Sequence, residues 1–148
     1  MSAWRPPRPL LTLVGPTGSG KSDLAIHLAQ RFGGEIVNCD SMQLYCGFDI
    51  GTAKTPPAGR AGIPHHLFDV LSPQESYSAG EYARAAREIV REISGRGKLP
   101  VIVGGCASYQ AGLHLMRTGA AGVLVGVGPG HACTTRGVLG IEIGRAHV

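Results

Sequence analysis

The stretch "LLTLVGPTGSGKSDLAIHLAQRFGG", residues 10–34, decides the fold. Its first six residues form a short apolar run that ends in glycine, which predicts a buried strand. After the glycine-rich turn, apolar residues recur at three- and four-residue spacing, which predicts an amphipathic helix on one face of a sheet. These residues are Leu24, Ala25, Leu28, Ala29 and Phe32. The double glycine at positions 33 and 34 ends the predicted helix.

The turn itself, "GPTGSGKS" at residues 15–22, fits the pattern G-x-x-x-x-G-K-[ST] between a strand and a helix. Backbone N–H groups and the helix N-terminus favour phosphate oxygens there. Lys21 is expected to reach the terminal phosphate and to act in catalysis, and Ser22 to ligate Mg²⁺. The predicted binding residues are Gly15, Pro16, Thr17, Gly18, Ser19, Gly20, Lys21 and Ser22. The structural alternative is a glycine-rich turn with no ligand.

The chain then continues in an α/β order. "EIVN" predicts a second strand that ends at Asp40, and residues 41–73 have no regular period. Ser78 and Glu81 form a capping box before a second amphipathic helix, and "LPVIVGG" predicts a third strand. The predicted fold is α/β, a parallel sheet of the P-loop NTPase type with flanking helices, here truncated.

Asp40 follows the second predicted strand, and ligands of doubly wound sheets lie at the carboxyl ends of strands. We expect this acid next to the phosphate-binding turn. It would hold Mg²⁺ through water, or act as a general base for an acceptor beside the phosphates. The structural alternative is an aspartate that caps a turn.

Composition sets the broad class. The chain has 148 residues, a net charge of +4 and a pI of about 9.1, which permits a nucleic-acid partner without requiring one. Four cysteines form no C-x-x-C pair, so we expect reduced thiols and no zinc site. No apolar run is long enough for a bilayer span, so we expect a cytoplasmic protein with no membrane partner, and a monomer.

Several motifs in unbroken order resemble the tRNA dimethylallyltransferases, also called tRNA isopentenyltransferases. They are "GPTGSGKS", "EIVNCDSMQLYCGFDIGTAK", "GIPHHLFDVLSPQESYSAGEYARAA" and "LPVIVGG", and they run from about residue 11 to residue 105. One departure is "GTAKTPP", where the family usually has proline directly after the lysine.

The resemblance implies transfer of a dimethylallyl group from dimethylallyl diphosphate to N6 of the adenine beside the anticodon of tRNA. By this resemblance Asp40 is the general base, and Ser41, Met42 and Gln43 belong to the loop that contacts the flipped adenine. Residues 17–22 bind diphosphate with Mg²⁺. The implied partners are tRNA, dimethylallyl diphosphate and ATP.

Several other residues have both a functional and a structural interpretation. Thr52 and Lys54 are candidate substrate-channel contacts or parts of a solvated loop. Tyr45 is a stacking face or a core tyrosine, and the adjacent His65 and His66 shape the site rather than hold a metal. Three arginines of the second helix are expected on a solvated face, with RNA phosphate as the alternative partner; they are Arg84, Arg87 and Arg91.

The resemblance to this family ends after Gly105, where the family would show threonine and this chain has Cys106. Residues 106–141 resemble a fragment of the IMP dehydrogenase and GMP reductase family, in which "GPGHACTTR" places Cys133 as nucleophile and Thr135 near it. We therefore expect residues 1–105 to be the N-terminal part of a dimethylallyltransferase, and residues 106–148 to be a foreign or poorly ordered tail joined in a chimera.

Two other functions stay open at this stage. P-loop small-molecule kinases share the phosphate-binding turn and place an acid near the acceptor. A nucleotide-binding protein without turnover also fits the turn alone. Separate binding measurements with dimethylallyl diphosphate, ATP and tRNA distinguish the three functions.

Overall fold

The computed structural model describes residues 9–15 and 18–104. The elements follow in the order β1 (Leu11–Val14), α1 (Lys21–Phe32), β2 (Gly34–Cys39), a 3-10 helix (Pro57–Arg60), β3 (His65–His66), α2 (Ala79–Gly95) and β4 (Leu99–Gly104). The predicted tail, residues 106–148, lies outside the described residues.

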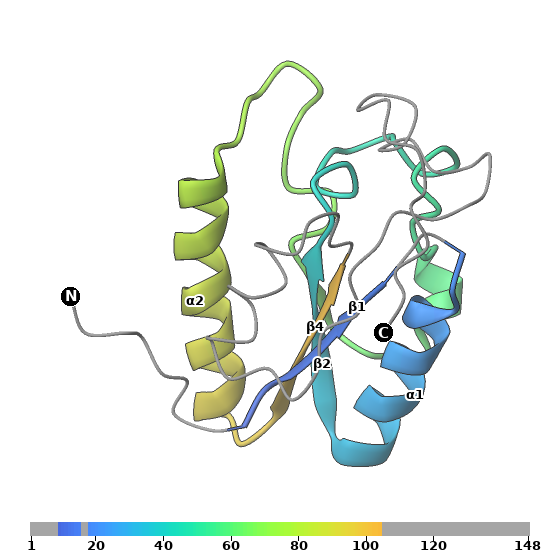
Figure 1. The fold of residues 1–148 in the computed structure, drawn as a ribbon, viewed down its shortest axis with the longest axis vertical. Coiled ribbons are helices and arrows are strands. Elements are labelled where there is room, and N and C mark those ends of the chain that lie inside the picture. Colours follow the sequence, from blue (N-terminus) through green and yellow to red (C-terminus); the bar gives the residue numbers. More distant parts are fainter. Residues whose placement is uncertain (1–8, 16–17, 105–148) are drawn as a thin grey trace, which may run out of the picture.

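The described strands form one parallel sheet in the order β1-β4-β2-β3 (Figure 1). The predicted α/β fold with a parallel sheet is confirmed. The sequence signals do not predict this strand order. β4 pairs with β1 on one side and with β2 on the other, so the strand that leads to Asp40 does not adjoin the strand that leads to the glycine-rich turn.

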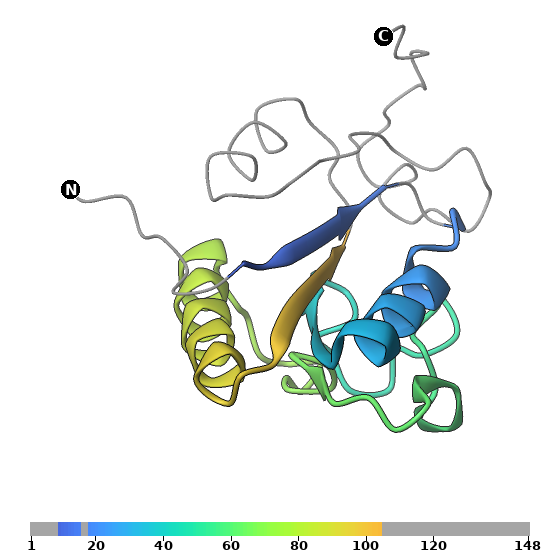
Figure 2. The ribbon, with the colours of Figure 1, turned by 90° about the horizontal axis from the view of Figure 1, so that it is seen from below.

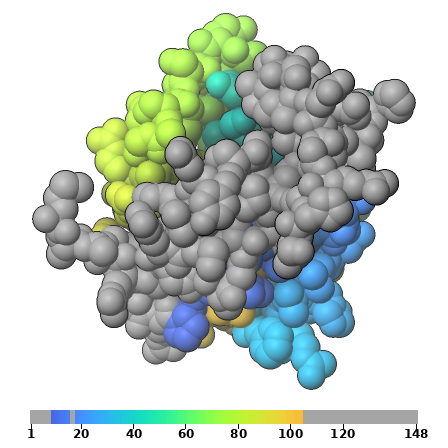
Figure 3. All heavy atoms as spheres, in the orientation of Figure 1, coloured from blue at the N-terminus to red at the C-terminus, as the bar shows by residue number. Residues whose placement is uncertain are grey.

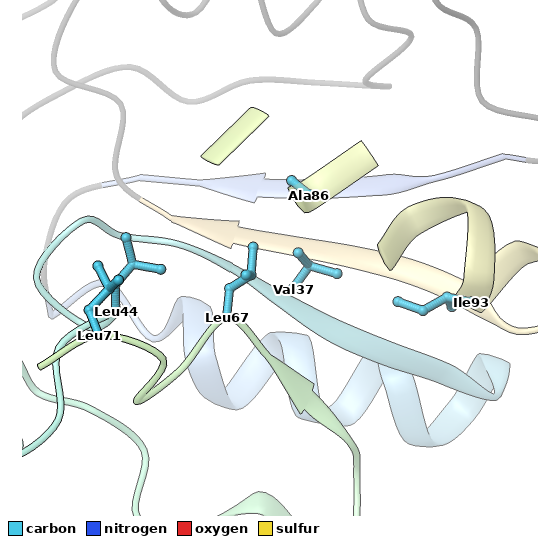
Figure 4. Close-up of a cluster of buried hydrophobic side chains, with 6 residues drawn as sticks. All are labelled: Val37, Leu44, Leu67, Leu71, Ala86 and Ile93. Atoms are coloured by element: carbon cyan, nitrogen blue, oxygen red, sulfur yellow. The ribbon is translucent and has the colours of Figure 1, made fainter. Parts of the chain in front are cut away.

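The two helices cover opposite faces of the sheet (Figure 2). Side chains alternate between faces along a strand, so Ile36 and Val37 of β2 enter different clusters. Ile36 joins the cluster of α1, and Val37 joins the cluster of α2, which Figure 4 shows with Leu44, Leu67 and Leu71. Leu44, in the loop after β2, is therefore part of the hydrophobic core on the α2 side of the sheet.

Helix α1 forms where the apolar spacing predicts it, and the predicted Ala25 and Ala29 are buried, but the buried face includes Ile26 in place of two other predicted residues. Leu24 and Phe32, both predicted to face the core, are 48% and 58% exposed, and the buried residues are Ala25, Ile26 and Ala29. Small side chains let the helix lie close to the sheet. The outer surface of α1 (blue) lies on the flank of the molecule opposite to α2 (yellow-green) in Figure 3.

Helix α2 begins at the predicted capping box, which the structure confirms. The Ser78 hydroxyl accepts a hydrogen bond from the Glu81 backbone N–H, and the Glu81 carboxylate accepts one from the Ser78 N–H. The helix then buries Ala86, Val90 and Ile93 against the sheet. Among the described residues, no helix combines the length and the apolar character that crossing a membrane requires.

The irregular segment holds one strand that the sequence analysis missed. β3 has two residues, and it pairs in parallel with β2 at Ile36 and Val37. A strand this short has no measurable alternation, which is why periodicity did not predict it.

Candidate functional site

The glycine-rich turn has the backbone shape that an anion-binding loop needs. Gly18 and Gly20 have φ of 79° and 80°, a left-handed conformation that side chains rarely adopt. A Cβ at Gly15 would lie 3.4 Å from the Ser19 Oγ and 3.6 Å from Lys21 Cδ, so the turn folds back over its own start. Pro16 and Thr17 lie outside the described residues.

The N-terminus of α1 is available to a ligand. Its N-cap is Gly20, so the N-cap residue offers no side chain to the first N–H groups of this 12-residue helix. Gly18, Ser19, Gly20 and Ser22 are exposed, and Lys21 is half-buried in the first turn.

Mg²⁺ fits this set of donors. The ion takes oxygen ligands and is usually held by one or two protein oxygens together with phosphate oxygens and water. The exposed Ser22 hydroxyl in the first turn of α1 supplies one such oxygen. The described residues contain no cluster of three or more His, Cys, Asp or Glu side chains that would hold a metal ion without a phosphate ligand.

Asp40 directly follows β2 and is half-buried. Its Oδ1 accepts a hydrogen bond of 2.9 Å from the Met42 backbone N–H, which is the turn-capping contact of the structural alternative. Its backbone N–H donates to Asn38 Oδ1, and its carbonyl oxygen accepts from Asn38 Nδ2, both at 2.9 Å. Within the described part of the chain no hydrogen bond to Oδ2 is formed. The turn-capping contact therefore uses one carboxylate oxygen, Oδ1, and leaves the other available.

The turn and the Asp40 region meet although β4 separates their strands. A small cavity of about 20 Å³ is lined by both Ser22 of α1 and Gln43 of the loop after β2. At the end of β4, Gly104 lies against β2 so closely that a Cβ there would be 2.4 Å from the Cys39 carbonyl oxygen. The carboxyl ends of these strands therefore form one edge that carries both groups.

Residues 41–55, which follow Asp40, form a loop that is called the 41–55 loop below. Within it, Gln43 Nε2 donates to the Thr52 carbonyl oxygen at 2.9 Å, and the Thr52 hydroxyl donates to the Phe48 carbonyl oxygen. An open cavity of about 390 Å³ lies in this loop, and its lining is Met42, Gly47, Phe48, Asp49, Ile50, Gly51 and Thr52. Met42 is thus placed at the cavity, whereas the Gln43 side-chain amide closes the loop.

Lys54 is buried, so the alternative of a solvated loop is wrong for this residue. Its side chain is 3% exposed, and Nζ lies 2.6 Å from Asp69 Oδ1, 3.0 Å from Asp49 Oδ1 and 2.7 Å from the Tyr45 carbonyl oxygen. Burial opposes the charged form, but hydrogen bonds to Asp69 and Asp49 outweigh it and raise the pKa of Lys54. The ammonium group ties the 41–55 loop to the segment after β3.

The two histidines have different partners. His65 donates from Nδ1 to the Ile63 carbonyl oxygen at 2.8 Å, and its ring lines the small cavity with Ser22. Burial lowers the pKa of His65. His66 Nε2 lies 2.7 Å from Glu35 Oε2, near the opposite end of β2 from Asp40.

The remaining candidates are Tyr45 and the three arginines of α2. Tyr45 is half-buried, packs against the α2 core and has its ring centroid 5.9 Å from that of Phe48, so the core alternative describes its environment. The three arginines of α2 are exposed, as expected for a solvated face, and none forms an ion pair with a described residue.

Two features of the site were missed by the sequence analysis. Asn38 reads as the polar end of an apolar strand, and nothing in its spacing signals that its side chain holds Asp40. The partners of Lys54 are 5 and 15 residues away along an irregular segment, where no period predicts contacts.

Two family models match the chain. The model described as IPP transferase matches residues 43–118, and the model described as isopentenyl transferase matches residues 9–62. The first match extends past the boundary at Gly105 that the sequence analysis expects.

Among similar proteins, the tRNA dimethylallyltransferase of Solibacter usitatus is 57% identical over 105 residues, which are 71% of this chain and 34% of that protein. A crystal structure of tRNA delta(2)-isopentenylpyrophosphate transferase from Staphylococcus epidermidis is 48% identical, with a TM-score of 0.64 over 66% of this chain and 32% of that one. A eukaryotic dimethylallyltransferase captured acting on tRNA is 41% identical, with a TM-score of 0.63 over 65% and 24%.

The chain spans about a third of the length of the curated relatives that it matches. The likeness covers the glycine-rich turn, Asp40 and the described sheet, since the two family matches together run from residue 9 to residue 118. With a model match over more than half of its residues, this chain belongs to the IPP transferase family.

Proposed function

We propose that this chain carries the donor-binding turn and the general base of a tRNA dimethylallyltransferase. The reaction moves a dimethylallyl group from dimethylallyl diphosphate to N6 of the adenine adjacent to the anticodon. The observation that carries the proposal is the shared strand edge. The α1 N-terminus, whose N-cap Gly20 has no side chain, and Asp40 at the end of β2 both lie at this edge, and Ser22 of α1 lines a small cavity together with Gln43 of the loop after Asp40. The names of the relatives support the substrate class.

The donor binds by its diphosphate. The N–H groups of the glycine-rich turn and the Lys21 ammonium offer positive charge where the leaving diphosphate gains negative charge. Ser22 would hold Mg²⁺ against the phosphate oxygens, and the ion would neutralise part of that charge. These contacts strengthen as the bond breaks, so they lower the barrier rather than only binding the substrate.

The acceptor requires a base. The N6 amine of adenine is a weak nucleophile because its lone pair is delocalised into the ring. As this lone pair forms the new C–N bond, the allylic C–O bond breaks and its electron pair leaves with diphosphate. Asp40 takes the N6 proton on Oδ2, since Oδ1 already accepts the Met42 N–H. General base catalysis of this kind contributes about 10²- to 10⁴-fold.

The acceptor side also needs room for a base taken out of its stack. The cavity of about 390 Å³ in the 41–55 loop begins at Met42, two residues after Asp40. Its size falls within the range of small-molecule sites, about 300–1,000 Å³. We assign this cavity to the adenine.

The test measures transfer of labelled dimethylallyl groups to an anticodon stem-loop RNA. It uses the 148-residue chain and a chimera in which residues 1–104 replace the matching third of the Solibacter usitatus relative. Asp40→Asn should lower the transfer rate by about 10²- to 10⁴-fold with unchanged pyrophosphate affinity. Glu88→Gln is the matched control, because Glu88 is an exposed acid on α2, outside the turn that binds the donor.

Two results would contradict the proposal. The first is a chimera with Asp40→Asn that transfers as fast as the unmodified chimera. The second is tight binding of ATP together with no binding of dimethylallyl diphosphate, which would favour a kinase instead.

A further inference from the structure

Asn38 is a buried polar side chain with every hydrogen-bonding position of its amide nitrogen used. It is 1% exposed. Nδ2 donates to the Leu67 carbonyl oxygen at 2.8 Å and to the Asp40 carbonyl oxygen at 2.9 Å, and Oδ1 accepts from the Asp40 N–H at 2.9 Å. A flipped amide would place its oxygen against two carbonyl oxygens, so the partners allow one orientation. The side chain is therefore fixed.

Two of these three bonds hold the backbone of one residue, Asp40. They engage both the N–H and the carbonyl oxygen of Asp40. Because the backbone of Asp40 is held on both sides of its Cα, the direction in which its side chain leaves the end of β2 is set. The Met42 N–H then holds Oδ1 of that carboxylate. The direction of Oδ2 is thus set by a chain of bonds that begins at the Asn38 amide.

Asn38 is itself anchored from two sides. The Leu67 carbonyl oxygen belongs to the segment after β3, where Leu67 is buried and has a positive φ of 60°. The Tyr82 hydroxyl of α2 donates to the Asn38 backbone carbonyl oxygen at 2.8 Å. Burial raises the pKa of Tyr82, which keeps this hydroxyl protonated as a donor.

We propose that Asn38 is a positioning residue for prenyl transfer, which holds the Asp40 carboxylate so that Oδ2 faces the acceptor amine. The inference rests on the proposed function, because it gives Asp40 the role of base. Asn38 touches no substrate in this scheme. Its contribution is orientation, and a reacting group misplaced by about 1 Å costs a rate factor of about 10².

The variant Asn38→Ser tests the inference with a modest change. Serine is too short to grip both backbone groups of Asp40 and adds no charge to the core. Tyr82→Phe is the matched control. It removes one buried hydrogen bond from the same residue, at the backbone carbonyl oxygen, and leaves the Asn38 amide and its bonds to Asp40 in place.

The first measurement needs no activity. Amide hydrogen exchange, followed by NMR on the 148-residue chain, reports the N–H groups of Asp40 and Met42. We expect Asn38→Ser to speed exchange at both by about tenfold or more, the factor for about 1.4 kcal/mol of a lost hydrogen bond. Tyr82→Phe should leave the relative protection of these two groups unchanged. Unchanged exchange in Asn38→Ser overturns the inference.

The second measurement is transfer by the chimera described above. Asn38→Ser should lower kcat by about 10- to 100-fold, with the pyrophosphate Kd and the donor KM within twofold of the unmodified protein. A purely structural loss would also weaken binding and would appear equally in Tyr82→Phe, which would overturn the inference. If Asp40→Asn is inactive while Asn38→Ser is fully active, the inference alone fails. If Asp40→Asn is active, the proposed function fails first.

Discussion

Replacing Lys54 by methionine should destabilise the chain, and the structure sets the size of the effect. Methionine fills a similar volume, so the change removes the charge with little cavity. The three lost partners are the Tyr45 carbonyl oxygen, Asp69 and Asp49, whose carboxylates are 39% and 65% exposed. Because water replaces much of what the two acids lose, their pairing is worth about 1 kcal/mol rather than the 3–5 kcal/mol of a buried pair.

The carbonyl oxygen adds a second contribution. A hydrogen bond from a charged donor is worth about 1.5 kcal/mol, so the total for Lys54→Met is about 2.5 kcal/mol. With a urea m-value of about 2 kcal/mol/M, the unfolding midpoint should fall by about 1.2 M. Far-UV circular dichroism in urea measures it, and Lys98→Met is the control because Lys98 is exposed and makes its hydrogen bond to Ile93 through its backbone.

The pH dependence gives an independent check. Since the pKa of Lys54 is raised above its ordinary 10.5, its stabilisation is present in full below that value and is lost as the pH rises through the higher folded value. The difference between wild type and Lys54→Met should therefore shrink above pH 10.5. The reasoning is refuted if Lys54→Met unfolds at the wild-type midpoint at pH 7, or if Lys98→Met falls as far.

Three further outcomes are expected. Lys21→Ala should lower pyrophosphate affinity by at least about tenfold with an unchanged unfolding midpoint, because a charge-assisted contact is lost and no core is disturbed; isothermal calorimetry with unchanged affinity would remove Lys21 from the site. Burial opposes the charged form of Glu35, but hydrogen bonds from Arg96 and His66 outweigh it and lower the pKa of Glu35. The stabilisation by Glu35 is thus present above its ordinary pKa of 4.5 and is lost as the pH falls through the lower folded value. In urea titrations between pH 6 and pH 3, the free energy of unfolding of Glu35→Gln should therefore decrease less than that of the unmodified chain. Ser78→Ala removes the N-cap of α2 and should lower the stability by about 1 kcal/mol; an unchanged Tm in scanning calorimetry would mean that the cap is dispensable.

Much of the architecture follows from local sequence signals. The glycine pattern, the capping box and the apolar runs predict β1, α1, β2, α2 and β4, because each signal is confined to a few neighbouring residues. The strand order does not follow from them, since the apolar run of β4 is equally suited to an edge or to the central place between β1 and β2.

The burial of α1 shows a second limit of periodicity. Leu24 and Phe32 share the core spacing of Ala25 and Ala29, yet the two alanines are buried together with Ile26 while Leu24 and Phe32 stay exposed. A face of small residues allows a closer approach of helix and sheet, and hydropathy alone ranks it below a face of leucine and phenylalanine.

The candidate site also has a part that local sequence predicts and a part that depends on contacts in the folded chain. The phosphate-binding turn is contiguous in sequence, so a pattern predicts it. The bonds from Asn38 to Leu67 and from Tyr82 to Asn38 span 29 and 44 residues, and each depends on the folded sheet. Residue type alone also fails in such an irregular segment. A lysine in a polar loop is normally solvated, but Lys54 is buried.

The tip of the 41–55 loop, residues 47–53, has a property that matters for how new specificities arise. Among the described residues, the hydrogen bonds that shape the tip connect it only to other residues of the loop, and Ile50 at its end is 97% exposed. The sequence of such a tip is exchangeable with little disturbance to the strands that carry the turn and Asp40, provided that Asp49 keeps its ion pair with Lys54. Under the proposed function, selection for a different acceptor would act on these few positions and leave the turn and Asp40 unchanged.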